Sequence, residues 1–141
     1  MFLIGIIAHL IGFLILVGII VLIVKCRGFH PEKFKLMEGE EIIKMAKGDY
    51  WQDSGLGETQ LSGEFAFTNK RVMFVPYFCL SDSQKVTIAL EDIASIEKAL
   101  LKNVFPVAFV IDTKTDESYK FAIMKRDIYI DLINSLIEKQ N

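Results

Sequence analysis

The chain has 141 residues, 52% of them hydrophobic, and a formal net charge of −2. No Asp, Glu, Lys or Arg precedes Lys25, so this charge belongs to the segment from Lys25 to Asn141, which is long enough for one compact domain. A nucleic-acid-binding domain is expected to be basic, so the slightly acidic balance excludes nucleic acid from the expected partners. The two cysteines, Cys26 and Cys79, provide no disulfide framework, and we expect Cys79 to be a buried strand thiol.

The amino-terminal segment is apolar and predicts a membrane anchor. As a helix, residues 2–24 would reach about 34 Å, enough to cross a hydrocarbon core of about 30 Å. A cleaved signal peptide would need a positive start, an apolar stretch of about 7–15 residues and a small-residue cleavage site. The sequence has none of the three, so we expect a retained transmembrane helix over residues 1–24.

Positive charge follows this span but does not precede it, apart from the amino terminus. Such an asymmetry orients a single-pass protein with its basic side in the cytoplasm. We therefore expect the amino terminus outside, a short connector over residues 25–39, and a cytoplasmic domain over residues 40–141. The juxtamembrane basic residues are Lys25, Arg27, Lys33 and Lys35.

Small residues line one face of the predicted anchor. Gly5, Ala8 and Gly12 have i, i+3 and i+7 spacing, which lets two helices approach closely and makes this face a candidate for homodimer formation. His9 lies within the same span, where an ionisable side chain is costly unless it is neutral or paired. We expect a neutral His9 bonded to a backbone carbonyl or to a partner helix.

After the connector, the hydrophobic pattern becomes that of short strands. Residues 41–51 predict one strand, and residues 61–80 predict a hairpin in which Asn69 tolerates the turn conformation at 68–71. Further strands are expected at 86–90, 93–98, 104–113 and 118–124.

The last segment has helical periodicity, with Asp127 in the first turn, where the helix dipole favours a carboxylate. The expected fold is therefore mainly β, a bent antiparallel sandwich or partly open barrel closed by one carboxy-terminal helix. The apolar stripe of this helix comprises Tyr129, Leu132, Ile133, Leu136 and Ile137.

Three segments carry a family resemblance. In their order and spacing, three segments resemble those of GRAM domains: the hairpin sequence GEFAFTNKRVMF at 63–74, IALEDIASIE at 88–97 and FAIMKRD at 121–127. The resemblance covers about residues 40–139 and implies a pleckstrin-homology-like fold. It also implies a non-catalytic module that binds lipid head groups or protein partners.

The candidate lipid-binding residues are Lys44 and Lys47 in the first strand and Lys70 and Arg71 at the hairpin turn. The loop after the first strand carries acids and no base, so the sequence does not predict the convergent basic site that a phosphoinositide needs. No catalytic constellation is evident. Cys26 and His30 would supply only two metal ligands, fewer than a zinc site takes, so we expect no enzyme, metal or cofactor.

Two functional hypotheses follow from these observations. In the first, the domain binds the lipid surface to which it is tethered, and weak contacts suffice because tethering raises the effective concentration of head groups. In the second, the domain is a docking module that presents a groove or a sheet edge to a soluble or membrane protein, or to a second copy of itself.

Overall fold

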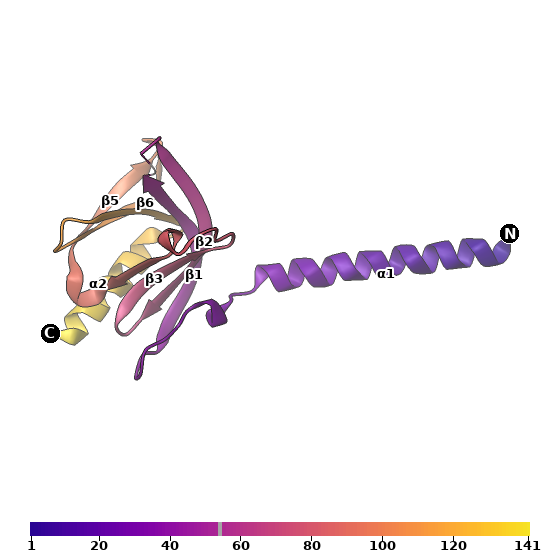
Figure 1. The fold of residues 1–141 in the computed structure, drawn as a ribbon, viewed down its shortest axis with the longest axis horizontal. Coiled ribbons are helices and arrows are strands. Elements are labelled where there is room, and N and C mark those ends of the chain that lie inside the picture. The colour runs from indigo at the N-terminus through magenta and orange to yellow at the C-terminus, as the bar shows by residue number, and fades with distance from the viewer. Residues whose placement is uncertain (54) are drawn as a thin grey trace.

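The computed structural model describes residues 1–53 and 55–141, except for the side chains of residues 24–27. The predicted basic residues Lys25 and Arg27, together with Cys26, lie outside the described side chains. Two α-helices, seven strands and three short 3-10 helices make up the regular structure of the described chain (Figure 1). Their bounds are α1 Phe2–Arg27, β1 Ile42–Asp53, β2 Glu58–Thr68, β3 Arg71–Pro76, β4 Val86–Ala89, β5 Ile93–Leu101, β6 Phe105–Thr113, β7 Ser118–Ile123 and α2 Arg126–Gln140.

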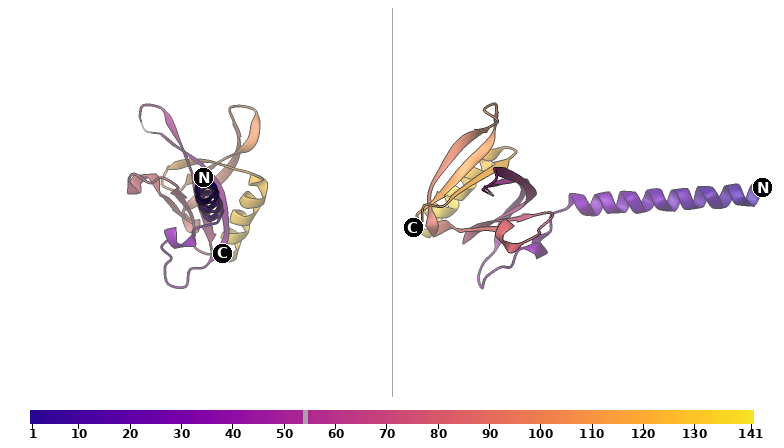
Figure 2. Two further views of the ribbon diagram at one scale, coloured as in Figure 1. Left: turned by 90° about the vertical axis from the view of Figure 1, so that its right-hand side faces the viewer. Right: turned by 45° about the horizontal axis from the view of Figure 1, so that its top comes forward.

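The strands form one antiparallel sheet in the order β4-β3-β2-β1-β7-β6-β5. The long strand β1 pairs with β2 along its length and with β7 over residues 48–51, so it joins the two halves of the sheet. The sheet curls around α2, while α1 leaves the domain on the side of β1, β2 and β3 (Figures 1 and 2). This architecture confirms the predicted fold: a bent antiparallel sheet followed by one helix.

The concave side of the sheet holds an aromatic core. Phe121 lies 5.2 Å from Phe65 and 5.6 Å from Phe109, measured between ring centroids. Gly48 of β1 is required at the bend, because a Cβ there would collide with the Ala122 carbonyl oxygen and lie 2.7 Å from the Phe65 ring. Helix α2 closes the core with Ile130, Ile133 and Leu136.

The predicted hairpin is confirmed, but β3 ends at Pro76 instead of continuing to residue 80. Proline has no backbone N–H to donate, and the chain leaves the sheet after Tyr77 bonds Ser62. Cys79 is consequently exposed, so the expectation of a buried strand thiol was wrong. Asn69 lies in the turn between β2 and β3, as predicted, and its φ is not positive.

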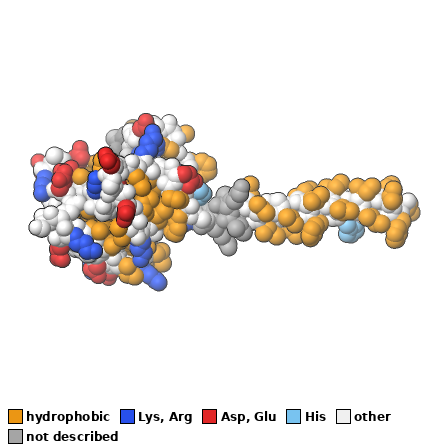
Figure 3. All heavy atoms as spheres, turned by 90° about the horizontal axis from the view of Figure 1, so that it is seen from below, with side chains coloured by type: hydrophobic (Ala, Val, Ile, Leu, Met, Phe, Trp, Pro, Cys, Tyr) orange, Lys and Arg blue, Asp and Glu red, His pale blue; other side chains and the backbone are white. Residues whose placement is uncertain are grey.

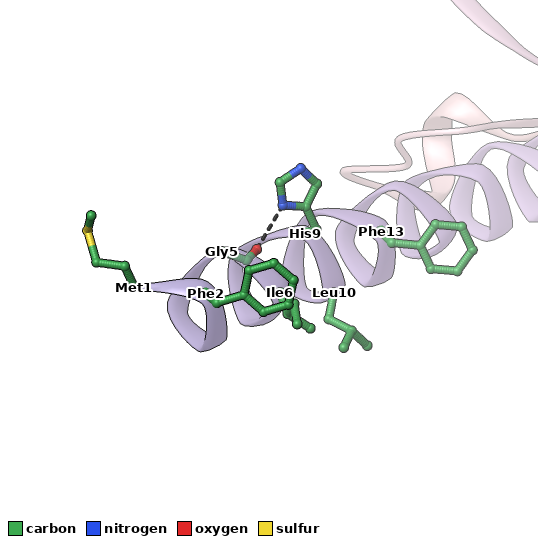
Figure 4. Close-up of a pocket in the computed structure, with 7 residues that line it drawn as sticks. All are labelled: Met1, Phe2, Gly5, Ile6, His9, Leu10 and Phe13. Atoms are coloured by element: carbon green, nitrogen blue, oxygen red, sulfur yellow. Dashed lines mark hydrogen bonds between the residues drawn. The ribbon is translucent and has the colours of Figure 1, made fainter.

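Helix α1 contains an apolar stretch, Phe2–Ile23, that is long and apolar enough to cross a membrane, with its side chains exposed in the isolated chain. Figure 4 shows the imidazole of His9 turned back along the helix, where Nδ1 donates a hydrogen bond to the Gly5 carbonyl oxygen at 2.8 Å. A carbonyl only accepts, so Nδ1 carries the proton in this contact. The expected bond from His9 to a backbone carbonyl is confirmed.

Candidate functional site

The segment that follows α1 docks on the outer, convex face of β1, β2 and β3. In this face Lys47, Glu64 and Val75 are cross-strand neighbours. The Glu64 carboxylate accepts hydrogen bonds from His30 Nδ1 at 2.8 Å and from the His30 backbone N–H at 3.1 Å. The side chain of Glu64 is fully buried as a result.

Phe34, four residues after His30, also packs on the outer face of the sheet. Its ring is buried in a small apolar cluster with Ala66, Met73 and Val75, on the opposite face of the sheet from the aromatic core. Buried apolar contact and a charge-assisted hydrogen bond thus hold residues 30–34 on the domain. The sequence predicted a short connector here, but it gave no signal that the connector covers the sheet.

The hairpin turn is fixed by a buried carboxylate, that of Glu40. Arg71 donates to it from Nε at 2.8 Å and from Nη2 at 3.0 Å, and the Thr68 hydroxyl donates at 2.8 Å. Burial alone would raise the pKa of Glu40. The hydrogen bonds from Arg71, from the Met37 N–H and from Thr68, together with the charge of Arg71, outweigh burial and lower the pKa from 4.5 to about 2. The guanidinium of Arg71 is therefore held inside the domain.

The four predicted lipid-binding residues lie in three separate places. Lys44 Nζ lies 5.1 Å from the Tyr129 ring centroid, towards α2. Lys47 Nζ lies 5.8 Å from the Phe29 ring centroid, on the connector side of the sheet. Lys70 Nζ donates to the Glu38 carbonyl oxygen at 2.7 Å, beside Arg71 at the hairpin turn. The fold does not bring these four side chains to one surface.

The fold instead gathers a different set of basic residues. A cavity of about 170 Å³ lies between the connector and the β3–β4 edge, and its basic lining residues are Lys33, Lys35, Arg71 and Lys85. Lys33 and Lys35 were predicted from their position beside the anchor. Lys85 was missed because it is far away in sequence, and only the pairing of Phe74 with Val86 brings it to this edge.

An exposed apolar loop lies next to this basic cavity. Phe78 and Leu80 are 87% and 90% exposed, and a second cavity of about 390 Å³ is lined by His30, Lys33, Tyr77 and Phe78. Burial raises the pKa of Tyr77, and the negative charges of Glu64 and Asp49 raise it further. Figure 3 shows hydrophobic side chains reaching from the middle of the domain towards the end that faces α1.

A second exposed apolar area lies away from the connector, where the β5–β6 hairpin meets the start of α2. Arg126 Nη1 donates to the carbonyl oxygens of Ala99 and Ala108, and Lys98 Nζ pairs with Asp127 Oδ1 at 2.9 Å, which fixes the helix start against β5. Strand β5 forms one edge of the sheet. The exposed apolar side chains here are Leu100, Val104, Phe105, Met124 and Ile128.

Among the residues that the structure describes, no three His, Cys, Asp or Glu side chains lie close enough together to hold a metal ion. The sequence offered Cys26 and His30 as two possible metal ligands, and the His30 side chain is hydrogen-bonded to Glu64. The polar groups of the docked connector and of the hairpin turn are thus used to hold the fold together.

A curled antiparallel sheet closed by a carboxy-terminal helix defines the pleckstrin-homology-like class of domains. The model of the GRAM domain family matches residues 28–141, so the chain belongs to the GRAM domain family. The match includes the docked segment from Gly28 onwards. Domains of this kind are typically non-catalytic modules that bind lipid head groups or proteins.

Solved structures show the same fold at low sequence identity. The Vps36 N-terminal PH domain has a TM-score of 0.56 at 16% identity, covering 74% of this chain and 84% of its own. The C-terminal domain of an unknown protein from Leishmania infantum has a TM-score of 0.58 at 16% identity, and the match covers 71% of this chain and 86% of that domain's chain. The DH/PH domains of p115-RhoGEF have a TM-score of 0.59 at 10% identity, and the match covers 80% of this chain and 35% of the p115-RhoGEF chain. No curated protein gives a significant match.

Proposed function

We propose that this protein is a membrane-anchored, non-catalytic GRAM module that lies against the cytoplasmic surface of the bilayer and binds lipid head groups weakly. The docking of the connector is the observation that carries this proposal. Helix α1 ends at Arg27, three residues before His30, which is bonded to Glu64. Three extended residues reach at most about 10 Å, so the outer face of β1–β3 is kept close to the end of the anchor.

Charge supports a cytoplasmic location and a weak attraction to lipid. The basic residues Lys25, Arg27, Lys33 and Lys35 follow the span, as the positive-inside effect requires. Near an anionic leaflet each such residue contributes about 1 kcal/mol of attraction. Of the predicted head-group contacts, we assign Lys47 on the outer face and Lys70 at the hairpin turn. Arg71 contributes indirectly, by holding the Glu40 carboxylate.

The test is head-group photo-crosslinking of the full chain in nanodiscs that contain a phospholipid with a photoactivatable head group. We expect crosslinked peptides from residues 28–37 and from β1–β3, and none from the exposed side of α2. Charge reversal in Lys47→Glu with Lys70→Glu should reduce the yield, whereas Lys102→Glu with Lys139→Glu, exposed lysines elsewhere, should not. Crosslinks spread evenly over the domain, or absent from it, would disprove the proposal.

Protein docking is the second candidate function, and the exposed apolar area formed by β5, β6 and the start of α2 favours it. A partner could cover this area while the side of β1–β3, from which α1 leaves the domain (Figure 1), lies against the bilayer. A photo-crosslinking amino acid at Phe105 should then give a defined adduct in cells, whereas one at Ser135, on an exposed position of α2, should not. A second copy of the chain, associated through Gly5, Ala8 and Gly12, would appear as a dimer that is lost in Gly12→Leu.

A further inference from the structure

We propose that the basic cavity between the connector and the β3–β4 edge binds the phosphate of an anionic glycerophospholipid, while the adjoining loop 77–80 contacts the glycerol and upper acyl region. This inference rests on the proposed function, because it needs the domain to lie at the bilayer surface. It differs in the residues used: the site comprises Lys33, Lys35 and Lys85 with Tyr77, Phe78 and Leu80.

The phosphate part of the site has an excess of positive charge. Arg71 also lines the cavity, but its charge is balanced by the buried carboxylate of Glu40. Lys85 is paired with Asp82, whose Oδ1 lies 3.3 Å from Lys85 Nζ and whose side chain is 96% exposed. An exposed ion pair of this kind is worth little, so a phosphate with several charged oxygens can replace Asp82 as the partner of Lys85.

The apolar part explains why the ligand is a lipid and not a free phosphate. Lys33 lines both cavities, and its Nζ lies 5.5 Å from the Tyr77 ring centroid, so the charged and apolar parts share a border. The carboxylates of Glu64 and Asp49 raise the pKa of Tyr77 in addition to burial, which makes that end unfavourable for an anion. A ligand that is anionic at one end and apolar at the other matches both parts.

The connector places both parts beside the anchor. Lys33 follows His30, which is fixed to Glu64, and the same His30 lines the apolar cavity. Phe78 and Leu80 are almost fully exposed, and aromatic side chains favour the membrane interface. The bilayer that holds α1 is therefore the surface within reach of this loop.

The test uses Cys79, an exposed thiol within the loop, as the attachment point for an environment-sensitive fluorophore. The full chain carrying Cys26→Ser would be labelled there and placed in phosphatidylcholine nanodiscs with or without phosphatidylserine. We expect phosphatidylserine to shift the emission to the blue and to protect the probe from iodide. Lys33→Glu with Lys35→Glu and Lys85→Glu should abolish both changes, whereas Lys102→Glu with Lys114→Glu and Lys139→Glu should keep them.

Two further variants examine the parts of the site separately. Asp82→Asn frees Lys85 and should lower the phosphatidylserine content needed for the half-maximal shift severalfold. Phe78→Ser with Leu80→Ser should remove the blue shift, whereas Leu56→Ser, an exposed leucine between β1 and β2, should not.

Three results would overturn the inference. The first is a probe that remains in water at every phosphatidylserine content, and the second is an equal loss in both lysine triple variants. The third is a blue shift produced by inorganic phosphate added to the chain in neutral detergent, which would identify a soluble phosphate ligand. If any of these results occurred while head-group crosslinks still formed on β1–β3, only this inference would fail and the proposed function would stand. If the head-group crosslinks were also absent, both proposals would fail.

Discussion

The two sides of the curled sheet are covered in different ways. On the concave side, α2 packs apolar side chains against an aromatic core that includes Phe65, Phe67 and Phe121. On the convex side, a connector without regular helix or strand structure along most of its length covers β2 and β3, using the carboxylates of Glu64 and Glu40 together with one buried ring, that of Phe34.

This difference shows how α1 and the domain are joined. Apolar burial on the concave side is insensitive to charge and makes the domain stable. The convex side depends on hydrogen bonds to buried carboxylates, which are costly to leave unsatisfied and which fix one arrangement of the connector. The position of the domain relative to the end of α1 is therefore set by polar contacts together with the ring of Phe34, whereas the fold is set by apolar contacts.

The largest effect is expected from removing a ring on the concave side. Phe121 is fully buried and contacts the rings of Tyr50, Phe65, Phe74 and Phe109. Phe121→Ala should lower the free energy of unfolding by about 3–5 kcal/mol, because it leaves a cavity among close-packed rings. Chemical denaturation of the full chain in nanodiscs, followed by Trp51 fluorescence, would measure this loss. Phe105→Ala, at a 55% exposed site, is the matched control and should change stability little.

On the convex side, the largest effect is expected from Glu40→Gln. The pKa of Glu40 is about 2 instead of 4.5, so the folded state holds fewer protons than the unfolded state in this range. The stabilisation, about 3 kcal/mol at about 1.4 kcal/mol per pKa unit, is fully present above about pH 4.5 and is lost as the pH falls towards 2. Denaturation at a series of pH values should show this loss in the wild type and not in Glu40→Gln.

The control for this experiment is Glu41→Gln, a neighbouring exposed carboxylate. It should keep the stability of the wild type at neutral pH and its decline in acid. If Glu41→Gln removed the decline as completely as Glu40→Gln, the loss of stability in acid would come from carboxylates on the surface of the hairpin. It would then not come from the buried pair of Glu40 and Arg71.

A smaller and local effect is expected from His30→Ala. The variant loses the 2.8 Å bond to Glu64 but keeps the backbone N–H that also bonds this carboxylate. A hydrogen bond to a charged group contributes about 1.5–3 kcal/mol, and here the loss should appear as opening of the connector. Hydrogen exchange should increase in residues 28–37 and remain unchanged in β5 and β6, whereas Glu32→Ala, an exposed neighbour, should have no effect. Faster exchange throughout the sheet would mean that His30 stabilises the whole domain.

The sequence predicted the concave side better than the convex side, for a physical reason. Phe65 and Phe67 alternate with polar or small residues, and Ile133 and Leu136 recur at helical spacing, so local periodicity reports which face is buried. The contact between His30 and Glu64 joins two polar residues that are far apart in the chain, and no periodicity marks such a pair. Lys85 was missed for the same reason, because only the pairing of β3 with β4 brings it close to Lys33 and Lys35.

Asn69 provides the smallest and sharpest of these tests, because the sequence and the structure give different reasons for its presence. The sequence suggested an asparagine that is present because it tolerates the turn conformation. The structure shows a side chain that accepts from the Glu41 N–H at 2.9 Å and donates to the Gly39 carbonyl oxygen at 3.1 Å. If these bonds are what matters, Asn69→Gly should lose about 2 kcal/mol despite its backbone freedom, because it removes two neutral hydrogen bonds and each contributes about 1 kcal/mol. Asn69→Asp should lose less, since it keeps the acceptor for Glu41. The reverse order in denaturation midpoints, with glycine the more stable, would show that backbone conformation decides the turn. It would also show that the bonds connecting the turn to the end of the connector add little to stability.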